Sequence, residues 1–485
     1  MSPPRPLNAT LSDATVPTLP PAVTRPAYER RDLAVGVVHL GPGAFFRAHQ
    51  APVFEALAAR GERRFGVLAA GLVSAAHSAA LASQDGLFVL EIRDGAETAR
   101  QVIGVVREAV SLAPREALAA GKAHDRLLRG LSAPTTHLVT LTLTEASYAP
   151  DPPTGAFSVG ALLAEALDLR RARGLAPFTA LSCDNLDDNG RRLAALVQAA
   201  AADRPALGDW IARHGAFPST MVDRIAPAAR EADRAAFTKQ TGLIDAALTP
   251  TEPYWSWVIE DRFAGPRPEL ESVGVTVTAD VTPFAQAKLR LLNAAHSLLA
   301  YLGLLLGHAF VHEAMADPAL ARAVQALWDE AETTLTPPAG LELSTYRAAL
   351  LRRFANAGLP HRLDQIATDG SRKLPPRLLA SLTARQDRPS PALALGAAAW
   401  LKALATPRRP FHDASTAAVA RFAALRGPAQ DRVQEARALG LLPDLTPAKL
   451  KEVAAALARL DAEGPQAAVR RALEHDAFSR SPRKR

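Results

Sequence analysis

Cysteine is almost absent from this chain, since Cys183 is the only one among 485 residues. One thiol cannot form an internal disulfide, and it cannot supply a zinc site built from several thiolates. Such scarcity is typical of a reducing compartment, so we expect a cytoplasmic location. The histidines also lack the spacing of metal ligands, and we expect no metal. Those considered are His39, His49, His77 and His296.

Long apolar segments are scarce as well. Residues 1–7 are rich in proline and lack the apolar core of a signal peptide. The apolar run Leu298–Phe310 is shorter than the roughly 20 residues that cross a bilayer. We therefore expect no export signal and no membrane association.

The excess of positive charge is small. The formal net charge is +7. It falls to +3 without the four basic residues near the end of the chain, Arg480, Arg483, Lys484 and Arg485. No basic patch interleaved with aromatic side chains accompanies this charge, so a nucleic-acid partner is not expected. The basic tail, 479–485, is interpreted as a solvated end.

Apolar residues make up 48% of the chain, which is enough for two cores. Up to about Thr282, apolar runs of strand type alternate with alanine-rich helical stretches, a pattern typical of a parallel sheet. These runs are Val35–Leu40, Phe65–Ala70, His137–Thr144, Phe178–Cys183 and Val273–Val281. After Pro283 the pattern is almost wholly helical. We expect a loose arm over 1–27, an α/β domain over 28–282 and a helical domain over 283–478.

A glycine turn follows the first of these runs. Gly41-Pro-Gly43 separates the run that ends at Leu40 from a helical stretch over Ala44–Leu57. Glycines let the backbone approach a dinucleotide pyrophosphate, and the N–H groups of a helix start bind its charge. The fingerprint is incomplete because Phe46 takes the place of the usual third glycine, and a plain tight turn is the alternative interpretation.

A second motif sets three polar side chains in an apolar segment. Lys288, Asn293 and His296 share one face if the segment is a regular α-helix with about 100° per residue. A lysine in apolar surroundings loses proton affinity and can act as a base near neutral pH. The alternative is an amphipathic helix whose lysine reaches solvent and whose histidine belongs to the core.

Five segments in a fixed order carry a family resemblance. They are His39–Gln50, Thr142–Tyr148, Ser182–Gly190, Phe217–Ile225 and Lys288–Ser297. Together they resemble the mannitol dehydrogenase family of long-chain, metal-independent polyol dehydrogenases. The segments Glu252–Asp261 and His361–Arg377 extend the resemblance over most of residues 35–405. It implies a Rossmann-type, doubly wound parallel sheet domain that binds NAD, followed by a mostly α-helical substrate domain.

The resemblance also implies roles for individual residues. Lys288 would exchange a proton with the substrate hydroxyl during hydride transfer. Three further catalytic residues, Asn185, Asn293 and His296, would hold the reacting oxygen. The matching cofactor positions are Gly41, Gly43, Phe46, Arg47, Glu145, Val222 and Asp223. NADP stays possible, because no acidic residue for the ribose hydroxyls follows the second strand, where Ser74 is the only hydroxyl.

The expected substrate is small and rich in hydroxyls. Lys373 and Arg377 match a substrate-contacting segment of the family, and Arg362 is close to them in sequence. Several cations suit a carboxylate, which favours the pair D-mannonate and D-fructuronate. The neutral pair D-mannitol and D-fructose is the alternative.

Two departures from the family pattern leave a third interpretation open. Ala285 stands where a glutamate is usual, three residues before Lys288, and Ala146 replaces a lysine. A nicotinamide-binding sensor or scaffold without turnover would fit these losses. Retention of Lys288, Asn293 and His296 favours an active enzyme.

Overall fold

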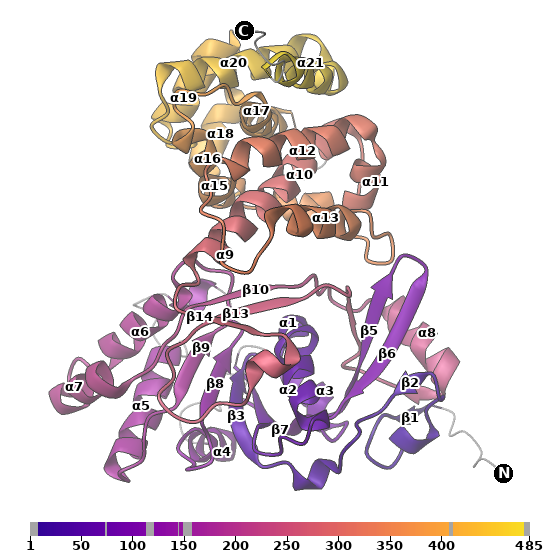
Figure 1. The fold of residues 1–485 in the computed structure, drawn as a ribbon, viewed down its shortest axis with the longest axis vertical. Coiled ribbons are helices and arrows are strands. Elements are labelled where there is room, and N and C mark those ends of the chain that lie inside the picture. The colour runs from indigo at the N-terminus through magenta and orange to yellow at the C-terminus, as the bar shows by residue number, and fades with distance from the viewer. Residues whose placement is uncertain are drawn as a thin grey trace. The chain divides into compact units, whose positions relative to one another are not determined.

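The computed structural model describes residues 8–72, 75–112, 121–143, 145–148, 158–406 and 411–479, without the side chains of 145–146 and 475–479. The chain divides into two compact units, Met1–Val281 and Thr282–Arg485 (Figure 1). We call them unit 1 and unit 2 and describe each by itself.

The central layer of unit 1 is a sheet of five parallel strands in the order β7-β4-β3-β8-β9. The strands are β3 (Val35–Leu40), β4 (Gly66–Gly71), β7 (Val106–Ser111), β8 (Leu138–Leu141) and β9 (Thr179–Ser182). From β3 the chain adds strands on one side, then returns to add β8 and β9 on the other. This order confirms the predicted doubly wound, Rossmann-type sheet, whose ligands bind beyond the carboxyl ends of the strands where the order reverses.

Both faces of the sheet are buried at β4, β3, β8 and β9, which explains why these strands are mostly apolar, whereas the edge strand β7 is mostly half-buried and carries Arg107 and Glu108. Successive residues of a strand point to opposite faces, and Val37 and Val38 accordingly belong to two different core clusters. Helix α2 (Gln50–Ala59) covers the Val37 side, while α5 (Val159–Ala172) and α6 (Asn189–Ala200) cover the Val38 side.

Besides the two-stranded pair of β1 (Ala9–Thr10) and β11 (Leu243–Ile244), the described residues of unit 1 form a four-stranded sheet of order β12-β5-β6-β2 and a three-stranded sheet of order β10-β13-β14. Their strands are β2 (Val23–Thr24), β5 (Phe88–Asp94), β6 (Glu97–Ile103), β10 (Thr220–Asp223), β12 (Thr249–Thr251), β13 (Ser256–Glu260) and β14 (Thr276–Thr278). The prediction of a strand over Val273–Val281 in the parallel sheet was wrong both in its bounds and in the sheet that the strand joins. Leu270–Val273 form a 3-10 turn, and β14 pairs with β13 instead of joining the five-stranded sheet.

The prediction of a loose arm over 1–27 was wrong for its described part, residues 8–27. Leu11, Leu19 and Val23 are at most 5% exposed and share a core cluster with β5 and β6. Strand β1 (Ala9–Thr10) also pairs with β11 (Leu243–Ile244). Three large apolar side chains were enough to anchor a segment whose prolines suggested a free arm.

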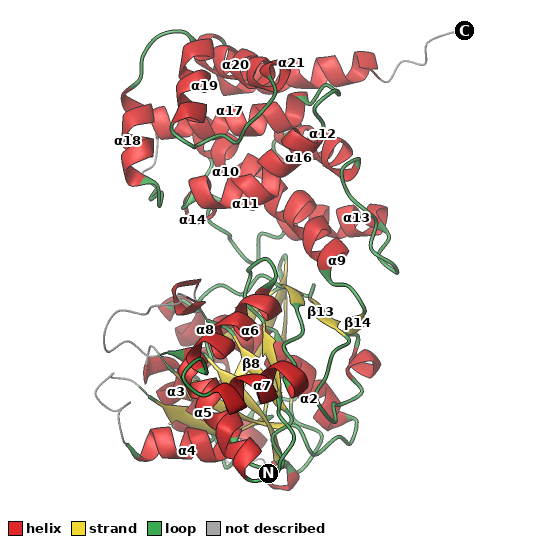
Figure 2. Cartoon of the chain, turned by 90° about the vertical axis from the view of Figure 1, so that its left-hand side faces the viewer, coloured by secondary structure: helices red, strands yellow, loops and turns green. Residues whose placement is uncertain are grey.

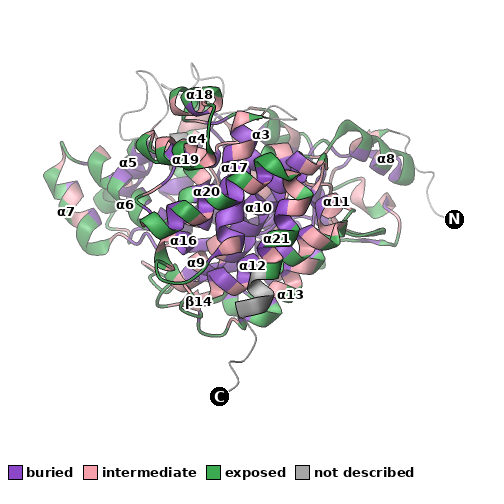
Figure 3. Cartoon of the chain, turned by 90° about the horizontal axis from the view of Figure 1, so that it is seen from above, coloured by how far each residue is buried: buried purple, intermediate pink, exposed green. Residues whose placement is uncertain are grey.

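Unit 2 is built from helices, as predicted (Figure 2). They are α9 (Thr282–Ala287), α10 (Ala294–Leu306), α11 (Val311–Ala316), α12 (Pro318–Glu332), α13 (Leu343–Phe354), α14 (Leu363–Ala367), α15 (Gly370–Leu374), α16 (Ala380–Ala384), α17 (Pro391–Ala405), α18 (Thr416–Ala424), α19 (Ala429–Ala438), α20 (Pro447–Ala462) and α21 (Gly464–Ser479). Helix α10 is buried along nearly its whole length and packs against α12, α14 and α17 (Figure 3).

The helix that contains α10 is continuous over Thr282–Leu306, and its most apolar window has a mean hydropathy of 1.4. At 25 residues it is long enough to cross a bilayer, so the length argument drawn from Leu298–Phe310 does not hold. However, 83% of that window is buried inside the structure. Its place in the core of unit 2 accounts for its apolar composition.

Two turns of unit 2 are π-helical: η6 (Lys288–Asn293) and η7 (Pro375–Leu379). In such a turn an N–H bonds the carbonyl five residues back, and π-helical turns are frequent at functional sites. The assumption of a regular α-helix from Lys288 to Asn293 was therefore wrong. The π-helical turn places these two residues, five positions apart, about one turn from each other on the same side.

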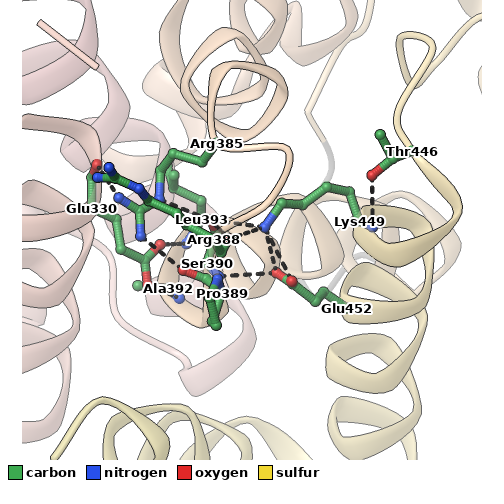
Figure 4. Close-up of polar contacts among 10 residues, drawn as sticks. All are labelled: Glu330, Arg385, Arg388, Pro389, Ser390, Ala392, Leu393, Thr446, Lys449 and Glu452. Atoms are coloured by element: carbon green, nitrogen blue, oxygen red, sulfur yellow. Dashed lines mark hydrogen bonds and ion pairs between the residues drawn. The ribbon is translucent and has the colours of Figure 1, made fainter. Parts of the chain in front are cut away.

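A buried polar network joins α12, α17 and α20 (Figure 4). The Nζ of Lys449, on α20, donates to Ser390 Oγ and to Glu452, each at 3.0 Å. Glu330, on α12, accepts two backbone N–H groups at the start of α17, each at 2.9 Å. Lys449 is 1% exposed and Glu330 4%, so the network lies inside unit 2.

Candidate active site

The glycine turn lies at the carboxyl end of β3 and leads into α1 (Ala44–Ala48). Gly41 has a φ of 90°, and a Cβ there would lie 2.3 Å from the carbonyl oxygen of Thr142, so only glycine fits. A Cβ at Gly43 would meet only one atom within 4 Å, at 3.9 Å. The backbone at Gly43 is therefore open to a ligand. A dinucleotide pyrophosphate fits such a glycine turn at a helix start.

Side chains next to the turn hold its shape. The Nε2 of His39 donates to the carbonyl oxygen of Gly41 at 3.1 Å, and burial lowers the pKa of this histidine to about 3. Phe46 stacks on His39 with ring centroids 3.7 Å apart. Arg47 donates to the carbonyl oxygen of Pro42 at 2.8 Å. Phe46 and Arg47 thus support the turn with their side chains, and the backbone N–H of Arg47 donates to the carbonyl oxygen of Gly43 at 3.2 Å.

A hydrogen-bond network ties the loop after β8 to the end of β9. Asp184 accepts from the hydroxyl of Tyr148 and from the backbone N–H of Leu143, each at 2.5 Å. The hydroxyl of Tyr148 also lies 2.6 Å from Ser182 Oγ. Burial raises the pKa of Asp184 to about 6, against the hydrogen bonds that lower it. This network fixes the residue that directly precedes Asn185.

Asn189 connects the end of β9 to β10. Its Nδ2 donates to the carbonyl oxygens of Asp184 and Thr220, each at 3.0 Å, and its Oδ1 accepts the N–H of Thr220 at 2.9 Å. Val222 and Asp223 lie on β10 and are 3% and 4% exposed. Asn189, itself 1% exposed, therefore sets the spacing between the end of β9 and the strand that carries these two residues.

In unit 2, the helix of the half-buried Lys288 carries the buried polar side chains of Asn293 and His296. Asn293 and His296 are each 7% exposed. Within the described residues, Nδ2 of Asn293 and Nε2 of His296 have no hydrogen-bond partner. Buried polar atoms are normally paired, so these two mark a place for a polar ligand. Burial is the main cause that lowers the pKa of His296, and this imidazole is therefore neutral near pH 7.

Neighbouring side chains anchor the π-helical turn between Lys288 and Asn293. The Nε1 of Trp328, on α12, donates to the carbonyl oxygen of Leu291 at 2.9 Å. Arg290 donates to the carbonyl oxygen of Thr334 at 2.6 Å. These contacts stabilise the turn from outside the helix.

Two of the three predicted substrate-binding cations are partly buried. Burial lowers the pKa of Arg377 to about 10, and burial together with Arg377 lowers the pKa of Lys373. Arg362 differs: its side chain is 53% exposed, and its Nε donates to Asp364 at 2.9 Å. The structure therefore brings Lys373 and Arg377 together but leaves Arg362 at the surface.

The predicted site residues are distributed over both units. Asn185, Val222 and Asp223 belong to unit 1, whereas Lys288 and the other catalytic and substrate residues belong to unit 2. Glu145 begins the 3-10 turn η4 (Glu145–Tyr148), but its side chain lies outside the described residues, as does Ser74. Among the side chains that are described, no group of three His, Cys, Asp or Glu residues is arranged to hold a metal ion.

Two residues near His296 were missed from the sequence. Arg353, on α13, and His361, before α14, both contribute to lowering the pKa of its imidazole, after burial. They are 57 and 65 positions away in the chain, so no local pattern links them to the motif. One sequence signal existed for His361: it is the first residue of the segment His361–Arg377, which extends the family resemblance.

Comparisons with known proteins agree with this arrangement. The family models for the mannitol dehydrogenase Rossmann domain and C-terminal domain match residues 35–272 and 280–406. D-mannonate oxidoreductase of Escherichia coli (strain K12) is 37% identical over 81% of this chain and 84% of its own. The uncharacterized oxidoreductase YeiQ of the same organism is 38% identical over 79% and 82%.

A solved structure shows the same fold. Mannitol 2-dehydrogenase of Pseudomonas fluorescens, in a ternary complex with NAD and D-mannitol, has a TM-score of 0.82 and 30% identity, over 96% of this chain and 99% of that one. The match includes both the parallel sheet and the helical part. The chain is thus an oxidoreductase that belongs to the mannitol dehydrogenase family.

Proposed function

We propose that this enzyme interconverts D-mannonate and D-fructuronate with NAD, using Lys288 as general acid and base without a metal. The observation that carries the proposal is the pair of unpartnered buried atoms, Asn293 Nδ2 and His296 Nε2, on the helix of Lys288. Two buried donors beside a lysine suit a secondary alcohol or ketone oxygen. A relative of 37% identity is named D-mannonate oxidoreductase, which supports the sugar acid.

The nicotinamide cofactor is assigned to unit 1. Support comes from the open backbone at Gly43 and from the NAD in the solved relative. When bound, NAD accepts a hydride at C4 of its ring and NADH returns it. NAD is preferred, with NADP as the alternative, because the segment after β4 contains no arginine to bind a 2′-phosphate.

In the oxidative direction Lys288 takes the hydroxyl proton, and in the reductive direction it returns that proton to the oxygen. Asn293 donates its amide hydrogen to this oxygen as negative charge develops. Burial lowers the pKa of His296 and keeps its imidazole neutral, and the tautomer with its proton on Nε2 donates to the same oxygen. Such oriented donors contribute roughly 3 kcal/mol each to catalysis. Asn185 is proposed as a further donor on the strength of the family pattern.

The test is an assay of the purified protein with NADH or NADPH against D-fructuronate, D-tagaturonate and D-fructose. We expect turnover with NADH and a kcat/KM for D-fructuronate at least tenfold above that for D-fructose. The reverse preference would support a D-mannitol enzyme, the activity for which the solved relative is named. Binding of NADH without any turnover would support a sensor or scaffold.

A further inference from the structure

The helix that carries Lys373 and Arg377 lacks a cap from its own sequence. It begins at Gly370 and runs without a break through α15, η7 and α16. The preceding residue, Asp369, has a left-handed backbone with a φ of 57°, and among the described residues its side chain makes no capping hydrogen bond. The first N–H groups of a helix have no partner inside it. Another part of the chain must therefore supply the cap.

The cap comes from Asp413, which lies 42 positions after Ser371. The Oδ2 of Asp413 accepts the N–H of Ser371, the second residue of the helix, at 3.0 Å. Its Oδ1 accepts the hydroxyl of the same serine, and it also accepts the N–H of Ser415 at 3.2 Å. Asp413 is 5% exposed, so these bonds are shielded from water. A carboxylate at a helix start is also favoured by the helix dipole.

The two residues before Asp413 hold the same place. The N–H of Asp369 donates to the carbonyl oxygen of His412 at 2.9 Å, and His412 Nδ1 lies 3.4 Å from Asp369 Oδ1. The ring of Phe411 lies 5.9 Å from that of Tyr301, between centroids. We call Phe411–Asp413 the capping segment. It lies beyond residues 280–406, where the family model for the C-terminal domain matches.

Two core helices pack against the same helix start. A Cβ at Gly370 would lie 2.3 Å from the hydroxyl oxygen of Tyr301, on α10, and 2.5 Å from Nε1 of Trp400, on α17. Only glycine allows so close an approach. Tyr301 also donates to the carbonyl oxygen of Ala367 at 2.9 Å. Because α10 also carries His296, these contacts tie the helix of the two cations to the helix of the proposed oxygen-binding groups.

We propose that Asp413 is a positioning residue that sets where Lys373 and Arg377 meet the substrate. This inference rests on the proposed function, deepens it, and takes from the sequence the role of these two cations in substrate binding. Lys373 lies two positions after Ser371, so fraying of the first turn would displace its ammonium group. Lys373 and Arg377 are four positions apart, and repulsion between like charges at this spacing weakens a helix. Asp413 opposes this fraying through the backbone and does not itself touch the substrate.

The experiment compares Asp413→Ala and Asp413→Asn with the parent, using D-mannonate and NAD. Asp413→Ala should raise the KM for D-mannonate about tenfold, because the helix start loses its cap. Its kcat should stay within about threefold of the parent, and so should its dissociation constant for NADH. Asp413→Asn keeps one side-chain oxygen that can accept the N–H of Ser371, so its KM should stay within about threefold of the parent.

Asp317→Ala is the matched control, because it removes an aspartate cap from another helix of unit 2. Asp317 accepts the N–H of Ala319 at 2.8 Å at the start of α12. This variant should unfold at a lower urea concentration than the parent, while its KM for D-mannonate stays within about twofold. An equal rise of KM in Asp317→Ala and Asp413→Ala would overturn the proposal, because lost stability would then explain both.

Folded Asp413→Ala with the parent's KM would also overturn the proposal, since the cap would then serve stability alone. If Asp413→Ala does not fold, Ser371→Ala decides. It removes only the hydroxyl that Asp413 accepts and should raise the KM about threefold, and an unchanged KM would overturn the proposal. A parent that oxidises D-mannitol but not D-mannonate would overturn the proposed function, and the KM of the same variants for D-mannitol would then decide on Asp413.

Discussion

At the scale of single residues, Lys288 carries the proposed chemistry. Lys288→Ala should lower kcat at least a hundredfold, because general acid–base catalysis contributes that much or more. The dissociation constant for NADH, measured by fluorescence, should stay within about threefold, since the lysine acts on the substrate proton. A variant that keeps a tenth of the parent's turnover would contradict the assignment.

The raised pKa of Asp184 predicts that the stability of the protein depends on pH. Its pKa of about 6 in the folded protein is above the roughly 3.9 of an unfolded aspartate. The folded state therefore holds the proton more tightly, and the stability that this group contributes is present below about pH 4 and is lost as the pH rises through 6. Asp184→Asn removes the titration while keeping the size of the side chain.

Urea unfolding at pH 4 and pH 7 provides the measurement. The free energy of unfolding of Asp184→Asn minus that of the parent should rise by about 2 kcal/mol from pH 4 to pH 7. Asp187→Asn, at an exposed position three residues further on, should show no such change. A difference between Asp184→Asn and the parent that is independent of pH would contradict the raised pKa.

At the scale of elements, both segments that carry substrate candidates contain a π-helical turn, η6 and η7. The turn η6 alters the spacing between Lys288 and Asn293 that a regular helix would impose. Its cost is offset by contacts from α12, such as the hydrogen bond from Trp328 to Leu291. A helical wheel could identify the three polar side chains but not their true spacing.

The glycine turn makes a prediction about the element that joins β3 to α1. Gly43→Val should fold and weaken NADH binding at least tenfold, because its branched side chain would fill the open space beside the backbone. Gly41→Val should instead fail to fold, since its Cβ would lie 2.3 Å from a carbonyl oxygen. Circular dichroism and NADH fluorescence separate the two effects. Unchanged NADH affinity in folded Gly43→Val would place the cofactor elsewhere.

At the scale of the whole molecule, the Lys449 network ties α20 to the core of unit 2 (Figure 4). Lys449→Met removes the buried ammonium that donates to Glu452 and Ser390 and should destabilise the protein by about 2 kcal/mol. Lys451→Met, at an exposed position of the same helix, should change stability by less than about 0.5 kcal/mol. Chemical denaturation of the two variants measures the difference. Equal denaturation midpoints would show that the network adds nothing.

The sequence by itself determined the family, the parallel sheet and the helical second unit. Strand Val35–Leu40 has the bounds predicted for it, because its apolar run and the glycines that follow it are local signals. The glycine turn could be predicted for the same reason. Local signals did not reveal that Leu11, Leu19 and Val23 hold the first residues against the core.

Only the tertiary structure decided which polar groups meet. Phe354 and His361 contact the ring of His296 from more than 50 positions away, through the packing of α13 and the segment before α14 on α10. Arg362 was predicted to bind the substrate because it is close in sequence to Lys373 and Arg377. In the structure it binds Asp364 at the surface. Sequence proximity does not specify the direction of a side chain, which depends on the contacts that the folded chain makes available.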